Sequence, residues 1–108
     1  MVNEIGIDIV EIKRFDKYDK DSNKALSKIF SKSEVEYCFE KSMPSACLAG
    51  KYAAKEAIAK AFSVRDIKIT DFKMLEIIND KTGKPTLRSS INISEKNVKL
   101  SIAHDGGF

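Results

Sequence analysis

The sequence predicts one small domain that combines helices with an antiparallel strand hairpin. Its 108 residues, 43% of them hydrophobic, fit a single domain over residues 1–108 and are too few for two compact ones. Residues 46–62 contain seven alanines, which favour a helix. The turn sequence NDKTGKP, which begins at Asn79, separates two stretches rich in β-branched residues, a pattern typical of a hairpin.

The first expected element is a strand over residues 5–12. Ile5, Ile7 and Ile9 alternate with other residues along the chain, which is the period of a strand with one strongly apolar face. Asp8 falls on the second face, where carboxylates are usually exposed to solvent.

Two short helices are expected next. Apolar residues at helical spacing between positions 25 and 30, behind Ser22 as a cap, predict the first. The S-x-x-E spacing of Ser33 and Glu36 is that of a capping box and predicts that the second begins at Glu34. This second helix is expected to bury Val35, Cys38 and Phe39.

The alanine-rich helix and three strands complete the expected order. The helix covers residues 46–62, with Pro44 at a position where the first helical turn tolerates proline. Residues 72–78 and 86–93 flank the turn over 79–84 and predict a hairpin. A last strand is expected over residues 98–105.

The cysteines and the apolar segments limit the classes of protein. Cys38 and Cys47 are the only cysteines and His104 is the only histidine, so a zinc site or a disulfide framework is not expected. The first residues lack the pattern of a secretory signal, and no stretch approaches 18 apolar residues. We therefore expect a soluble cytoplasmic protein with no membrane contact.

Two carboxylates and a lysine are candidates for chemistry. Glu56 and Lys60 lie four residues apart on the alanine-rich helix, where the ordinary interpretation is a surface ion pair. Alanines beside them leave room for a ligand to approach the backbone. Asp8 and Glu56 with a nearby lysine are also what Mg²⁺ bound through substrate phosphates would use, although spacing alone does not decide this. A histidine at a strand end, such as His104, is more often structural than catalytic, and Gly83-Lys84-Pro85 by itself indicates only a turn.

Positive charge gathers in one segment. Residues 13–32 contain seven Lys or Arg against three Asp, whereas the whole chain carries a net charge of only +3. The segment is either a solvated face or a docking surface for an acidic partner. Nucleic acid is a weaker candidate, because no aromatic platform interleaves these lysines.

Four motifs then occur in a recognisable order. They are GIDIVEIKR (Gly6 to Arg14), LAGKYAAKEAIAKAF (Leu48 to Phe62), GKP (Gly83 to Pro85) and LSIAHD (Leu100 to Asp105). Together they resemble the holo-[acyl-carrier-protein] synthases, which are bacterial 4′-phosphopantetheinyl transferases. The first two motifs are jointly specific, whereas GKP alone is not.

The resemblance implies a fold and a reaction. The fold is a small α+β subunit, with an antiparallel sheet packed against an alanine-rich central helix and shorter helices, that assembles as a homotrimer with an active site at each interface. The reaction is the Mg²⁺-dependent transfer of 4′-phosphopantetheine from coenzyme A to a serine of an apo-acyl carrier protein, with release of adenosine 3′,5′-bisphosphate. The alternative is a non-enzymatic adaptor whose basic segment binds an acidic protein or nucleic acid.

The same resemblance assigns roles to individual residues. Asp8 and Glu56 are the implied Mg²⁺ ligands, and Glu56 and Lys60 the catalytic residues, with the serine proton passing to Glu56 or to a metal-bound water. The implied coenzyme A contacts are Lys51, Lys60, Gly83, Lys84, Pro85 and His104, of which Lys84, Pro85 and His104 come from the neighbouring subunit. Lys51 stands where the family usually has arginine. The implied docking residues for the acidic carrier protein are Arg14, Lys24 and Lys28.

The chain departs from the family in three places. Ser63-Val64-Arg65 follow the alanine-rich helix where the family has a glycine-containing loop, and Ala103 replaces a small hydroxyl residue. The family also continues beyond the histidine segment into another strand, whereas this sequence ends at Phe108. We therefore expect that the C-terminal strand is missing or truncated here.

Overall fold

The computed structural model describes residues 10–19, 21–64 and 66–89. In chain order the elements are η1 (Ile12–Phe15), α1 (Asn23–Leu26), α2 (Lys32–Phe39), α3 (Pro44–Ser63), η2 (Phe72–Met74), β1 (Leu75–Asn79) and β2 (Pro85–Ser89). Most of the strand predicted over 5–12, the strand predicted over 98–105, Asp8 and His104 lie outside the described residues. In the part that is described, no helix is long and apolar enough to cross a membrane.

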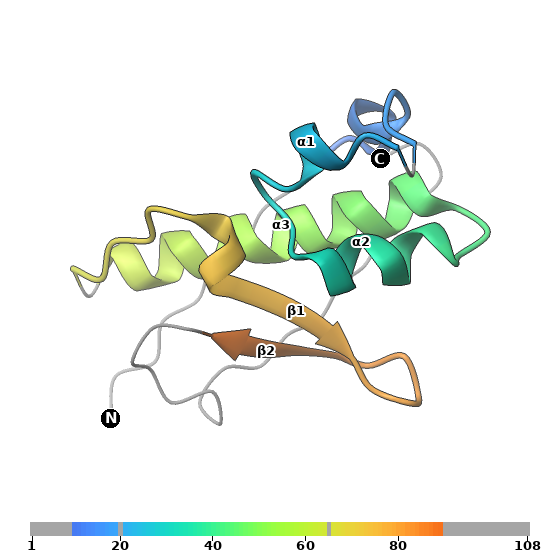
Figure 1. Ribbon diagram of the computed structural model, residues 1–108. Helices are drawn as coiled ribbons and strands as arrows, with labels where there is room; N and C mark the ends of the chain where they lie inside the picture. The colour runs from blue at the N-terminus through green and yellow to red at the C-terminus, as the bar shows by residue number, and fades with distance from the viewer. Residues whose placement is uncertain (1–9, 20, 65, 90–108) are drawn as a thin grey trace.

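Helix α3 runs through the middle of the fold, with the hairpin on one side and η1 and α1 on the other (Figure 1). It matches the predicted alanine-rich helix and includes Pro44 as its first residue, where the missing N–H costs no intrahelical bond. The helix closes where the backbone N–H of Ile67 donates to the carbonyl of Phe62 at 3.0 Å. Asp66, with a φ of 59°, provides the left-handed residue that this closure needs.

Helix α2 begins two residues earlier than the sequence predicted. The hydroxyl oxygen of Ser31 accepts from the backbone N–H of Glu34, and a carboxylate oxygen of Glu34 accepts from the N–H of Ser31. The capping box is therefore formed by Ser31 and Glu34, and the prediction from Ser33 and Glu36 is wrong. The reason is tertiary, because the Glu34 carboxylate has further partners in the core whereas Glu36 is exposed.

The N-terminal elements also differ from the prediction. Residues 12–15 form the 3₁₀ turn η1 and do not continue a strand, because this turn places Ile12 and Phe15 on one side, where both are buried. Helix α1 begins near the predicted Ser22 but ends at Leu26. Residues 27–29 then form a turn, in which the N–H of Phe30 donates to the carbonyl of Leu26.

The hairpin is confirmed, with Ile77 paired to Leu87 and Asn79 to Pro85. Asp80 organises its turn, since one carboxylate oxygen accepts from the N–H of Lys84 and from both the N–H and the hydroxyl of Thr82. Gly83 has a φ of +89°, a conformation that other residues adopt only with strain. Residues 72–74, predicted as the start of a strand, form the 3₁₀ turn η2 because Asp71 caps the N–H of Lys73.

Two apolar clusters form the core. The first joins η1, α1 and α2 to the N-terminal half of α3. The second packs the C-terminal half of α3 on the hairpin, through Ala54, Ile58, Leu75, Ile77 and Leu87. The described residues therefore form a small α+β fold, as predicted, in which α3 belongs to both clusters.

The prediction against a disulfide is wrong. Cys38, near the end of α2, and Cys47, in the first turn of α3, form a disulfide with their Cα atoms 5.3 Å apart. The two helices are joined by a short loop, so residues nine positions apart in the sequence meet where the helices pack. The number of cysteines alone did not reveal that Cys38 and Cys47 lie next to each other in the fold.

Candidate functional site

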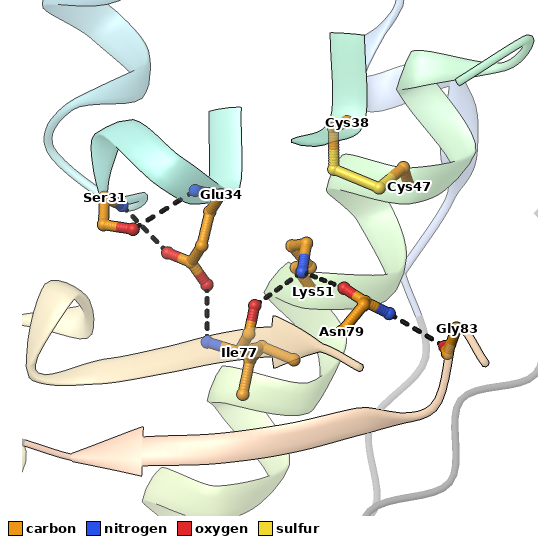
Figure 2. Close-up of a disulfide and its surroundings, with 8 residues drawn as sticks. All are labelled: Ser31, Glu34, Cys38, Cys47, Lys51, Ile77, Asn79 and Gly83. Carbon is orange, nitrogen blue, oxygen red and sulfur yellow. Dashed lines mark hydrogen bonds between the residues drawn. A yellow bond between two sulfur atoms is a disulfide. The ribbon is translucent and has the colours of Figure 1, made fainter. Parts of the chain in front are cut away.

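One face of α3 carries three links to its neighbours. Cys47, Lys51 and Lys55 follow one another at intervals of four residues, so their side chains lie one above the other. Cys47 is bonded to α2, and Lys51 reaches the end of β1 (Figure 2). Lys55, one turn further on, contacts α2 and the entry to β1.

Lys55 is fully buried, and its ammonium donates all of its hydrogen bonds to groups of the protein itself. Its ammonium donates to the Glu34 carboxylate at 2.7 Å and to the carbonyls of Ile29 and Phe72, each at 2.9 Å. The other oxygen of Glu34 accepts from the backbone N–H of Ile77 at 2.8 Å. Burial lowers the pKa of Lys55, and the Glu34 charge opposes that shift. Because all three ammonium donors are used, this ion pair joins α2, α3 and β1 and leaves no donor for a ligand.

The Glu34–Lys55 pair was not predicted from the sequence. A lysine within an alanine-rich helix is normally exposed, and nothing local indicates that this one turns inward. The sequence did contain a signal for Glu34, the other member of the pair, since Ser31 and Glu34 also have capping-box spacing. A choice between two overlapping boxes requires knowledge of which glutamate is buried.

Lys51, the predicted phosphate contact, is held in place by β1. Its ammonium donates to the carbonyl of Ile77 and to the side-chain oxygen of Asn79, both at 2.6 Å (Figure 2). The Asn79 amide in turn donates to the carbonyl of Gly83 at 3.0 Å. Burial lowers the pKa of Lys51 to about 8, with the charge of Glu34 opposing the shift. When protonated, the ammonium has one further donor for a bound anion.

This lysine lines a shallow cavity of about 380 Å³ between the start of α3, the end of α2 and the hairpin turn. Its lining residues are Tyr37, Lys41, Ser42, Met43, Ala46, Cys47, Gly50, Lys51, Asn79, Gly83 and Pro85. Three predicted ligand residues, Lys51, Gly83 and Pro85, are thus brought together. Lys84 is exposed in the same turn.

The cavity has cationic character. Lys41 and Lys51 both lie over the ring of Tyr37, 4.4 and 4.9 Å from its centre, and none of the described lining residues carries a carboxylate. Sequence reasoning did not identify Lys41 or Tyr37. The available signal was the position of Lys41 just before the N-terminus of α3, where the helix dipole also favours an anion.

Glu56 and Lys60 lie on a different face of α3 from this cavity. At 100° per residue, Glu56 is rotated by roughly 140° and Lys60 by roughly 180° from Lys51. Glu56 is half-buried and Lys60 is exposed. Within the described ranges, no three His, Cys, Asp or Glu side chains gather to hold a metal ion. Asp8 and His104, the other predicted site residues, lie outside these ranges.

The basic segment does not form one continuous helical face, because η1, α1 and the turns between them divide it. Arg14 lies over the ring of Tyr52, 4.8 Å from its centre, and donates to the tyrosine oxygen at 3.4 Å. Lys28 lines a second shallow cavity together with Tyr52. Lys24 is exposed on α1. Arg14 and Lys28 therefore each lie near Tyr52, and all three predicted docking residues are exposed.

The lowered pKa of Lys51 predicts a pH-dependent contribution to stability. The unfolded chain, with an ordinary lysine pKa of 10.5, binds more protons than the folded protein above pH 8, so this contribution increases between pH 8 and 10.5. The neutral amine keeps both hydrogen bonds, because two donors remain. In urea unfolding, the free energy of unfolding of the unmodified protein minus that of Lys51→Met should increase from pH 7 to pH 10. The exposed Lys81→Met control should show no such growth, and a difference that shrinks with pH would contradict the prediction.

Comparisons with known proteins agree with this fold. The family model of the 4′-phosphopantetheinyl transferase superfamily matches residues 4–106, and the chain belongs to that superfamily. The holo-[acyl-carrier-protein] synthase of Chlorobaculum tepidum is 40% identical over 103 residues, covering 94% of this chain and 88% of the relative. That of Halothermothrix orenii is 40% identical over 116 residues, covering 100% and 92%. Within the superfamily the chain is therefore a phosphopantetheinyl transferase of the holo-[acyl-carrier-protein] synthase family.

Solved structures show the same fold. The Chronobacterium ammoniagenes protein, solved as a complex with coenzyme A, superposes with a TM-score of 0.78 at 27% identity, covering 99% of this chain and 91% of that one. The Helicobacter pylori holo-[acyl-carrier-protein] synthase in complex with coenzyme A gives a TM-score of 0.72 at 33% identity, covering 95% and 91%. The α+β fold predicted from the sequence is confirmed.

Proposed function

We propose that this protein transfers the 4′-phosphopantetheine of coenzyme A to a serine hydroxyl of an apo-acyl carrier protein and releases adenosine 3′,5′-bisphosphate. The observation that carries the proposal is the cavity beside α3, where Lys41 and Lys51 both contact the ring of Tyr37 and no carboxylate is among the described lining residues. Coenzyme A is rich in phosphate, and such a lining favours phosphate groups. The coenzyme A complexes of two related proteins support the same ligand.

The positions of the candidate residues on α3 support a site shared between subunits. The cavity with Lys51 lies on one face of α3, and Glu56 and Lys60 lie on another. One extended ligand reaches both groups most directly when the cavity of one subunit faces Glu56 of its neighbour. We therefore propose a homotrimer in which Lys84, Pro85 and His104 come from the adjacent subunit, with the heterologous contacts of a closed ring.

Glu56 and Lys60 are the proposed catalytic residues. Negative charge grows on the pyrophosphate oxygens as the serine hydroxyl attacks the β-phosphorus, and the Lys60 ammonium neutralises it. Glu56 offers a half-buried carboxylate oxygen, the donor type that Mg²⁺ prefers. Mg²⁺ commonly binds only one or two protein carboxylates, so Glu56 and Asp8 together would be sufficient to hold it. The ion would supply further positive charge at the phosphates.

The reaction and its metal requirement can be tested together. The purified protein, incubated with coenzyme A, an apo-acyl carrier protein and Mg²⁺, should yield a carrier protein with one added phosphopantetheine thiol, detected by mass spectrometry. Chelation of the metal should abolish the product, and Glu56→Gln should do the same while the fold is retained. Glu36→Gln, which changes an exposed glutamate on α2, is the matched control and should remain active.

The outcomes separate the enzyme from the adaptor alternative. Carrier-protein binding without any product under all metal conditions would contradict the enzymatic proposal and favour an adaptor. Full activity of Glu56→Gln at saturating Mg²⁺ would remove Glu56 from the site.

Arg14, Lys24 and Lys28 are the proposed docking residues for the acidic carrier protein. Reversing the charge at each one should raise the KM for the carrier protein, chiefly by slowing association, and should make the rate less sensitive to salt. Coenzyme A affinity should change little. Lys81→Glu, in the hairpin turn, is the control for total charge. An unchanged KM for the carrier protein at low salt would identify the basic segment as a solvated face.

A further inference from the structure

The two sulfur atoms of the disulfide have different surroundings. Cys38 is completely buried between α2 and α3, whereas Cys47 is partly exposed and forms part of the wall of the cationic cavity. Figure 2 shows the disulfide on the face of α3 that also carries Lys51. Of the two cysteines, Cys47 is therefore the one that borders the cavity, while the protein covers Cys38 completely.

The surroundings of Cys47 also favour sulfur chemistry. Cys47 lies in the first turn of a 20-residue helix, whose positive end stabilises an anion. Lys51 follows it by one turn on the same face, and Lys41 lies across the cavity. Thiol–disulfide exchange proceeds through thiolates, so this environment attracts an incoming thiolate to Cys47.

We propose that Cys47 is a site of reversible modification by low-molecular-weight thiols, with Cys38 as its resolving partner. The thiolate of the small molecule attacks the sulfur of Cys47 and forms a mixed disulfide there. The electron pair of the broken S–S bond goes to the sulfur of Cys38, which takes up a proton. In the reverse step the Cys38 thiolate attacks Cys47 and expels the small thiolate, so neither direction needs another oxidant.

The modification should affect the cavity. An adduct on Cys47 projects into the space lined by Lys51 and Gly83 and competes with any ligand there. This consequence rests on the proposed function, because coenzyme A is the ligand expected to be displaced. The exchange chemistry itself does not depend on that proposal.

The position of exchange can be measured on the unmodified protein. The oxidised protein is incubated with glutathione, quenched with acid, alkylated at its free thiols, and digested for peptide mass analysis. Glutathione should occur on Cys47 at least tenfold more often than on Cys38, with the alkyl group on Cys38. Equal labelling of both cysteines, or no exchange in the absence of denaturant, would overturn the proposal.

The effect on the cavity can be measured with a stable adduct. In Cys38→Ser the resolving thiol is absent, so glutathione on Cys47 should persist. In calorimetry it should weaken the binding of S-methylated coenzyme A, which has no free thiol to displace the adduct, at least tenfold relative to the same variant without the adduct. Cys47→Ser is the matched control, whose coenzyme A affinity should not respond to oxidised glutathione. Unchanged affinity of the adduct would overturn the competition. If coenzyme A binds neither the adduct nor the unmodified protein, the proposed function fails, while the peptide masses still decide the exchange.

Discussion

Replacing Glu34 by alanine is expected to lower the free energy of unfolding by about 3–5 kcal/mol, because it leaves the buried Lys55 without its counter-charge. The change also removes the acceptor for the N–H of Ile77 and half of the capping box of α2. Urea unfolding followed by circular dichroism measures the effect. This loss is a large share of the stability of a domain of this size.

A matched pair on the same helix provides the control. Lys32 and Glu36 are also oppositely charged, but they are largely exposed and 3.9 Å apart. Glu36→Ala should cost no more than about 0.5 kcal/mol. If Glu34→Ala does not fold at all, Glu34→Gln serves in its place, and adding Lys55→Met to it should recover part of the lost stability. Equal effects of Glu34→Ala and Glu36→Ala would contradict the role assigned to the buried pair.

Replacing Lys60 by alanine is expected to slow transfer by roughly 30- to 1000-fold, corresponding to about 2–4 kcal/mol in the barrier. The proposed reason is that its ammonium stabilises charge that appears only in the transition state. The value of kcat should therefore fall much more than the KM for coenzyme A rises. Steady-state kinetics with a carrier protein measure both quantities.

Two further variants sharpen this test. Lys60→Arg should restore the rate only in part, because a planar guanidinium does not reproduce a compact ammonium. Lys68→Ala, at another exposed lysine, should leave kcat unchanged. A raised KM with an unchanged kcat for Lys60→Ala would show that Lys60 binds substrate and transition state equally.

The elements predicted correctly are those that depend on short stretches of sequence. Pro44 and the alanines that follow it determine α3, and Asp80 with Gly83 determines the hairpin turn. The start of α2 could not be predicted in this way. Two overlapping serine–glutamate boxes compete locally, and the choice depends on the contact between Glu34 and Lys55, which lie 21 residues apart.

The candidate site shows the same division. Lys51, Gly83 and Pro85 were predicted as ligand residues from motifs, and the structure places them in one cavity. That Lys51 is also fixed by Ile77 and Asn79 is a long-range contact that no local pattern indicates. The disulfide was missed for a related reason, because counting cysteines does not reveal which helices pack together.

The three links made by Cys47, Lys51 and Lys55 on α3 also determine the entropic cost of assembling the fold. Cys47 reaches a partner nine residues away, Lys55 one 21 residues away and Lys51 one 26 residues away. The entropy lost on closing a loop increases with its length, so the contact between Cys38 and Cys47 is the least costly of the three to form. Once α2 and α3 are paired, Glu34 already lies beside Lys55, and β1 docks against acceptors and donors that are in place. The contact between Lys51 and Ile77 of β1 therefore closes a shorter effective loop than the 26 residues that separate them in the sequence.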